Sequence, residues 1–173
     1  MSFYLFVYGT LKRDEPEHHY LEYETNGTSK FVSTAQTVKR YPLIIDTQYN
    51  IPFLIHREGM GHRILGEIYE VDERMMKTID ELKSHPNLYC RLQDSVRIFV
   101  EDEEDVKNIP VMKCWMYFIT DLKRDVGPVM LRSYHSDGYH GRPFLLRGSC
   151  FKAVNGFDVW RMNLEDESGR SAE

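Results

Sequence analysis

The sequence predicts an α+β protein built on a small, mixed, mainly antiparallel β-barrel with a few short helices packed beside it. The chain has 173 residues, a length that suits one domain with its own hydrophobic core. Seven short segments are rich in aromatic and β-branched residues and are bounded by Gly, Pro or Asn, as strands are. Only one segment has a convincing helical pattern, so strands must supply most of the core.

The expected strands cover residues 3–8, 31–38, 43–45, 51–56, 63–71, 88–101 and 111–119. Pro42 and Pro52 place the third and fourth strands at an edge or a bend, because proline cannot donate to a sheet. The acidic run at residues 101–105 is typical of a solvated hairpin tip between the last two strands.

The main expected helix runs from residue 73 to about residue 84. Asp72 is a suitable N-cap for it, and Pro86 ends it. Pro16 can open a short helix, and a further short helix is expected at residues 124–133. Residues 133–147 are expected to be a loop. We expect residues 1–150 to form the single domain and residues 151–173 to form a C-terminal extension with a frayed end.

The composition excludes several functional classes. The chain has 22 Lys and Arg against 27 Asp and Glu, a net charge of -5, which argues against nucleic-acid binding. No apolar run approaches the roughly 20 residues of a membrane span, and the N-terminus lacks the pattern of a secretory signal. The 3 cysteines are widely spaced, so we expect free thiols in a cytoplasmic (cytosolic) protein, with no metal site.

The motif that carries chemistry is Tyr8-Gly9-Thr10-Leu11, at the end of the first expected strand. Gly9 lets the backbone approach a ligand closely, and the amides of Thr10 and Leu11 can donate to a carbonyl or an anion. Taken alone, the motif is a weak signal, because such a turn more often has a purely structural role than a binding one.

The context of this motif is more specific. The chain carries, in order, FVYGTLKR at residues 6–13, YPLIID at 41–46, YNIPFLI at 49–55, GEIYEVDERM at 66–75 and SYHSDGYHG at 133–141. Together these segments resemble the γ-glutamylcyclotransferase-like family, and within it the γ-glutamylamine cyclotransferases, over about residues 3 to 141.

The resemblance implies the same kind of fold, a mixed barrel with helices beside it, and an activity. The enzymes cyclise a γ-glutamyl amine such as ε-(γ-glutamyl)lysine to 5-oxoproline and release the free amine. The substrate is a small molecule, no cofactor is needed, and we expect a monomer. The resemblance also implies that Tyr8, Gly9, Thr10 and Leu11 hold the γ-glutamyl portion of the substrate.

The general base does not carry over in the same way. The family places a glutamate on the helix after YEVDE, and the aligned position here is Lys83. Glu81 is the nearest carboxylate that could substitute. At about 100° per residue, Lys83 lies on the apolar stripe of the helix, whereas Glu81 lies roughly 160–200° away and faces solvent.

Lys83 fits two interpretations: a pocket lysine, or a lysine that leaves its ammonium in water. Glu67, Tyr134 and His140 are further candidates for the pocket, although a strand-edge charge explains Glu67 better and a surface loop explains Tyr134 and His140 better. Two functions therefore stay open. One is a cyclotransferase with an altered base. The other is a catalytically impaired relative that binds a γ-glutamyl or other carboxylate ligand.

Overall fold

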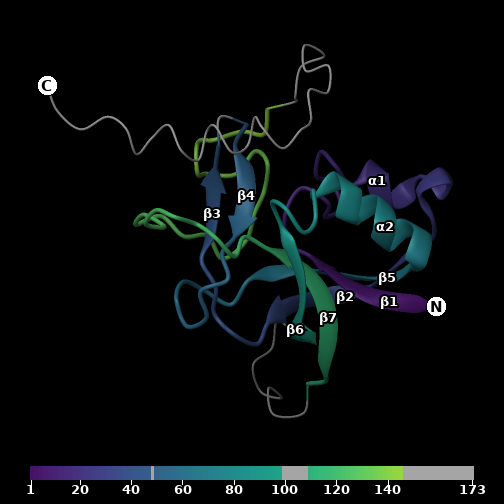
Figure 1. Ribbon diagram of the computed structural model, residues 1–173. Helices are drawn as coiled ribbons and strands as arrows, with labels where there is room; N and C mark the ends of the chain where they lie inside the picture. The colour runs from purple at the N-terminus through teal and green to yellow at the C-terminus, as the bar shows by residue number, and fades with distance from the viewer. Residues whose placement is uncertain (48, 99–108, 146–173) are drawn as a thin grey trace, which may run out of the picture.

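The fold is a closed five-stranded barrel, seen in a computed structural model that describes residues 1–47, 49–98 and 109–145 (Figure 1). Around the barrel the strands follow the order β1 (Ser2–Val7), β5 (Leu65–Asp72), β2 (Ser29–Thr37), β6 (Cys90–Ile98) and β7 (Val111–Phe118). β1 and β7 are parallel, and the other neighbours are antiparallel. The predicted mixed, mainly antiparallel barrel is therefore confirmed.

The remaining elements lie against this barrel. β3 (Leu43–Asp46) and β4 (Ile51–Leu54) form a separate antiparallel pair. The helices are α1 (His19–Glu22), the 3-10 helix η1 (Glu24–Asn26) and α2 (Glu73–Leu82). In Figure 1 both α-helices cover one side of the barrel, beside β1 and β5, and β3 and β4 stand at its upper end.

All seven expected strands and the helix after Asp72 are present, with ends that differ by a few residues from the expected ones. The expected helix at 124–133 is wrong. Gly127 has φ +73°, and Pro128 follows it, which prevents a continuous helix. The backbone of this segment forms a hydrogen bond with another element of the same chain instead, since the Leu131 N–H donates to the Leu43 carbonyl. The acidic tip at 101–105 and the extension at 151–173 lie outside the described residues.

Both faces of β1 are buried in its second half, from Leu5 to Val7, which explains the apolar run there. Phe6 packs inside the barrel with Ile68 of β5 and Met116 of β7. Leu5 belongs to a second cluster, on the outer face, with Ile79 of α2. Because side chains alternate along a strand, one short segment fills the barrel and also anchors the helix. The strand that leads into the Tyr8–Leu11 loop is therefore firmly held.

Asp72 joins the end of β5 to the start of α2. Its carboxylate accepts a hydrogen bond from the Met75 N–H at 2.8 Å and bonds from the N–H and hydroxyl of Thr28, each at 3.0 Å. The bond from Met75 is the main cause that lowers the pKa of the Asp72 carboxyl. The expected N-cap is confirmed, and it also ties the helix to the chain before β2.

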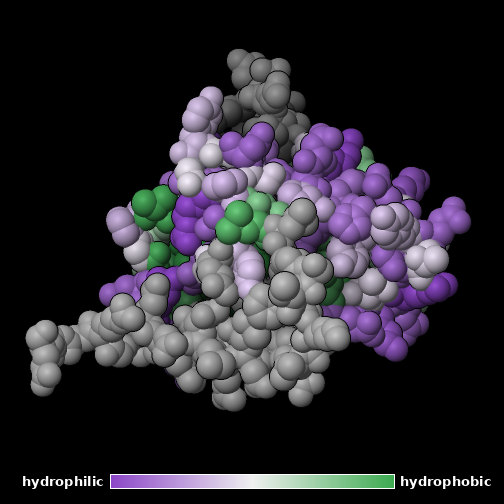
Figure 2. Space-filling view, turned by 90° about the horizontal axis from the view of Figure 1, so that it is seen from above, coloured by the Kyte–Doolittle hydropathy of each residue, from purple (hydrophilic) through white to green (hydrophobic). Residues whose placement is uncertain are grey.

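The described residues also show the polarity of the surface and the state of two cysteines. The coloured part of the surface on the helical side is mostly hydrophilic (Figure 2). Among the described residues, no helix is long and apolar enough to cross a membrane, and no group of three His, Cys, Asp or Glu could hold a metal ion. Cys90 and Cys114 are free thiols, and Cys150 lies outside the described residues.

We expect the two described thiols to react very differently. Cys114 is fully buried, and burial raises the pKa of its thiol to about 12, so it stays protonated at pH 8. Cys90 is only partly buried at the start of β6. Iodoacetamide at pH 8 should therefore modify Cys90 in the folded protein and modify Cys114 only after denaturation, as peptide mass spectrometry would show. Equal labelling of both thiols in the folded protein would contradict this burial.

Candidate active site

A pocket opens at the end of β1, where the strand passes into the Tyr8–Leu11 loop. It encloses about 300 Å³ with its mouth included. The lining residues are Phe6, Val7, Tyr8, Gly9, Thr10, Leu11, Pro52, Lys83 and Tyr117. Most of these side chains are apolar, so the few polar groups among them would fix the orientation of a ligand. The four loop residues singled out in the sequence thus line one cavity.

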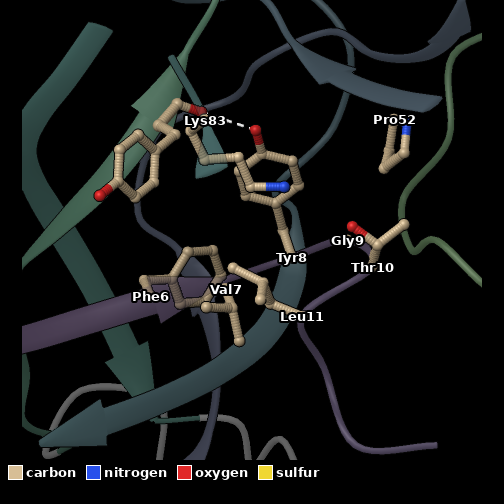
Figure 3. Close-up of a pocket in the computed structure, with 9 residues that line it drawn as sticks. Phe6, Val7, Tyr8, Gly9, Thr10, Leu11, Pro52 and Lys83 are labelled. Carbon is tan, nitrogen blue, oxygen red and sulfur yellow. Dashed lines mark hydrogen bonds between the residues drawn. The ribbon is translucent and has the colours of Figure 1, made fainter. Parts of the chain in front are cut away.

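Lys83 lies at the rim of this cavity because of how α2 ends. The helix ends at Leu82, Lys83 is its C-cap, and Ser84 has φ +50°, which turns the chain away. The Lys83 side chain extends toward the loop, with its nitrogen on the side of Gly9 and Thr10 (Figure 3). The same nitrogen lies 5.5 Å from the centre of the Tyr89 ring, a cation–π arrangement. Lys83 therefore faces the pocket, with only 13% of its side chain exposed.

A carboxylate that the sequence analysis missed stands against this lysine. Glu17 Oε2 lies 3.3 Å from Lys83 Nζ and also accepts a hydrogen bond from the Thr10 hydroxyl. The segment between the loop and α1 folds back on itself, since the Glu17 N–H donates to the Thr10 carbonyl at 2.9 Å. One oxygen of Glu17 thus contacts both the binding loop and the end of α2. No local pattern marks Glu17 in the sequence, because its partner is 66 positions away.

Two buried tyrosines hold the other wall. The Tyr8 hydroxyl donates to the Tyr117 carbonyl at 2.6 Å, and the Tyr117 hydroxyl donates to Asp80 Oδ1 at 2.7 Å. Burial raises the pKa of both phenols, and the bond to Asp80 raises that of Tyr117 further, so both stay neutral donors. Asp80 also pairs with Arg91 at 3.4 Å. These bonds tie the loop, β7 and α2 together around the pocket.

Glu67 and Glu81, the two carboxylates considered from the sequence, have other surroundings than Glu17. Glu67 accepts hydrogen bonds from the Arg13 N–H at 3.0 Å and from the Tyr69 hydroxyl at 2.8 Å. None of the three carboxylates is among the residues that line the pocket; Glu17 contacts two lining residues, Thr10 and Lys83, whereas Glu81 is exposed on α2. Helix geometry had placed Glu81 on the solvent side, and the exposed position agrees with that.

Tyr134 and His140 stack on each other, with ring centres 6.0 Å apart, and neither lines the pocket. Tyr134 is fully buried, and its hydroxyl has no hydrogen-bond partner among the described residues. Its carbonyl accepts a bond from Lys12 Nζ at 2.6 Å. His140 bonds through both ring nitrogens, to the His135 carbonyl and to the Arg142 N–H. The backbone thus occupies both nitrogens of His140.

Gly9 is where a small change should close the pocket. A Cβ atom added at this position would lie 2.7 Å from Cγ of Pro52, and a proline ring cannot swing aside. We expect Gly9→Ala to lower kcat/KM for a pocket substrate at least about 10-fold, because displacement of a binding loop by less than 1 Å already misplaces the reacting groups. Steady-state kinetics checks this, with thermal unfolding of the same preparation as the control for folding. An unchanged kcat/KM would show that the loop tolerates the contact.

The comparisons with known proteins point to one group. The family model described as gamma-glutamyl cyclotransferase, AIG2-like matches residues 5–140. A putative gamma-glutamylcyclotransferase of Drosophila melanogaster is 41% identical over 137 residues, covering 79% of this chain and 82% of the relative. The human gamma-glutamylaminecyclotransferase is 35% identical over 141 residues, covering 79% of this chain and 92% of that protein. A crystal structure of an AIG2-like protein from Mus musculus superposes with a TM-score of 0.74 at 33% identity, covering 84% of this chain and 97% of the other.

Proposed function

The chain belongs to the gamma-glutamyl cyclotransferase, AIG2-like family, and from this we propose that it cyclises a γ-glutamyl amine, such as ε-(γ-glutamyl)lysine, to 5-oxoproline and a free amine. One observation carries the proposal. The Tyr8–Leu11 loop, the segment expected to hold a γ-glutamyl group, lines a pocket that contains a cation and has a carboxylate at its edge.

The chemistry requires little from the protein. The α-amino nitrogen of the substrate attacks its own γ-carbonyl carbon, a C–N bond forms, and the bond to the leaving amine breaks. The attacking ammonium must lose one proton before it attacks and a second one to become the lactam N–H, and the leaving nitrogen takes up both to depart as an ammonium. A single base balances the reaction if it transfers these two protons in turn. The enzyme mainly holds a bent conformer and donates hydrogen bonds to the developing oxyanion.

The pocket has groups suited to these tasks. Loop amides can donate to the γ-carbonyl oxygen, and apolar walls such as Phe6 and Leu11 exclude water. The polar head of a γ-glutamyl group carries one ammonium and one carboxylate. Glu17 and Lys83 offer one charge of each sign at the same place, so the pair complements this head.

The direct test is release of 5-oxoproline from ε-(γ-glutamyl)lysine, followed by chromatography and mass spectrometry. Two control substrates sharpen the test. The Nα-acetylated compound lacks the nucleophile, and α-glutamyl-lysine carries its amide at the wrong carbonyl, so neither should release lysine. We expect turnover of ε-(γ-glutamyl)lysine only. If this substrate releases no 5-oxoproline, the proposal is contradicted.

A second candidate function rests on Lys83 itself. At this position a cation replaces the family's glutamate, and a pocket lysine attracts an anion and repels the α-ammonium of a substrate. A catalytically impaired relative would bind a γ-glutamyl or other carboxylate ligand without converting it. Binding of ε-(γ-glutamyl)lysine in calorimetry, with no 5-oxoproline formed over long incubation, would favour this function over the first.

A further inference from the structure

Resting on the proposed cyclotransferase activity, we propose that Glu17 is the general base of this protein and that Lys83 is a positioning residue that holds it and the substrate carboxylate. The carboxylate needed for the reaction would then come from the turns after the binding loop, not from the end of α2. The ion pair of Glu17 and Lys83 joins these two segments.

The first argument is position. Glu17 accepts the hydrogen bond of the Thr10 hydroxyl, so its carboxylate touches the loop that lines the pocket. Glu17 is not itself a lining residue, but it contacts two that are, Thr10 and Lys83. Glu67 and Glu81, the other carboxylates considered for this role, have other surroundings: Glu67 is held by Arg13 and Tyr69, and Glu81 is exposed. A general base must lie within hydrogen-bond reach of the proton that it accepts, and Glu17 meets that geometric condition for a substrate head held beside Thr10.

The second argument is charge. Glu17 and Lys83 are both largely buried, with 18% and 13% of their side chains exposed. The two opposite charges lie 3.3 Å apart, and an ionised carboxylate is the form that can take a proton. Burial raises the pKa of the Tyr134 phenol, and the negative charges of Glu15 and then Glu17 raise it further. Tyr134 therefore stays neutral beside the pair and does not compete for its charge.

The third argument is proton balance. Glu17 takes the proton from the substrate's α-ammonium, and the freed amine attacks the γ-carbonyl carbon. In the tetrahedral intermediate Glu17 gives this proton to the leaving nitrogen and takes the second proton from the attacking nitrogen. The bond to the leaving nitrogen then breaks, the carbonyl re-forms, and Glu17 passes the second proton to the released amine. Lys83 keeps its three protons throughout and binds the α-carboxylate as a fixed charge. No water, metal or redox partner enters the step.

The test uses Glu17→Gln, which keeps the size of the side chain and removes its ability to accept a proton. We expect kcat to fall about 10²–10⁴-fold, the usual cost of losing a general base, with KM changed less than about threefold. The acidic limb of the pH–rate profile should disappear with the base. Glu22→Gln is the matched control, because Glu22 lies in α1 close by with 65% of its side chain exposed.

A second variant distinguishes loss of the carboxylate from loss of the fold. Glu17→Gln leaves Lys83 without its ion pair, so Glu17→Gln/Lys83→Glu returns one carboxylate to the same spot from the other segment. We expect the double variant to regain at least tenfold in kcat over Glu17→Gln. Lys83→Met tests the positioning role: it should raise KM and move the acidic limb to higher pH, because an ammonium no longer favours the ionised carboxylate.

The outcomes separate the two proposals. If the wild-type protein turns over and Glu17→Gln keeps its activity within threefold, the assignment of Glu17 is overturned while the proposed function stands. If the double variant stays at the level of folded Glu17→Gln, the assignment is likewise overturned. If the wild-type protein releases no 5-oxoproline, the proposed function falls, and the role of Glu17 falls with it.

Discussion

Replacing Lys83 by glutamate is expected to lower kcat/KM at neutral pH at least about tenfold and to move the acidic limb of the pH profile upward. Lys83 Nζ lies 3.3 Å from Glu17 Oε2, so the new carboxylate would stand beside an existing one. Two carboxylates at such a distance cannot both be ionised readily, and one of them holds a proton until higher pH. The substrate carboxylate also loses its cation.

The measurement is kcat/KM for ε-(γ-glutamyl)lysine between pH 5 and 9. Lys77→Glu is the matched control, since it makes the same change of charge on an exposed position of α2, outside the pocket. The control should stay close to the wild-type protein. If Lys83→Glu turns over faster than the wild-type protein, Lys83 is an impairing residue, and the ligand-binding function becomes the better account.

Replacing Gly27 by alanine is expected to lower the free energy of unfolding by about 3 kcal/mol or more. Gly27 has φ +126°, a conformation that costs other residues about 1–3 kcal/mol. An added Cβ would lie 2.3 Å from the Met75 nitrogen and 2.4 Å from Asp72 Oδ1, so it would also break the N-cap of α2, worth about 0.5–2 kcal/mol.

Chemical denaturation checks this value, and Gly59→Ala is the matched control. Gly59 also has a positive φ, +90°, but a Cβ there would meet nothing within 4 Å. The control should cost only about 1 kcal/mol, the strain of the backbone alone. A loss for Gly27→Ala that equals the control would mean that α2 shifts to make room. In that case Lys83, at the far end of α2, should also change its contacts.

Much of the fold could be predicted because local patterns determine it. The apolar run of β1, the N-cap Asp72 and the stripe of α2 through Ile79 are all readable from spacing. The error at residues 124–133 arose because the described backbone bonds of that segment go to other elements: the Leu131 N–H donates to Leu43 of β3, and the Arg132 carbonyl accepts from Leu65 of β5. Such pairing depends on tertiary structure, and periodicity does not reveal it.

The site was predictable in part for the same reason. The Tyr8–Leu11 loop follows a strand, so its position could be predicted. The apolar stripe put Lys83 on the inward face of the helix but left open whether its ammonium reaches the pocket or water. Glu17 lies in a polar segment of successive turns that has no period. Its meeting with Lys83 depends on the end of α2 reaching the loop, which is a property of the assembled fold.

The closure of the barrel has a consequence for the order of assembly. β1 pairs with β7, and the Tyr8 hydroxyl reaches a carbonyl 109 positions later in the chain. Contacts between such distant residues form slowly, because a large loop must close before they bring any gain. During synthesis the binding loop therefore leaves the ribosome well before β7 and is fixed in place only after β7 has followed it. A stalled nascent chain that ends before β7 should leave Tyr8 open to protease, whereas a chain that extends past β7 should protect it.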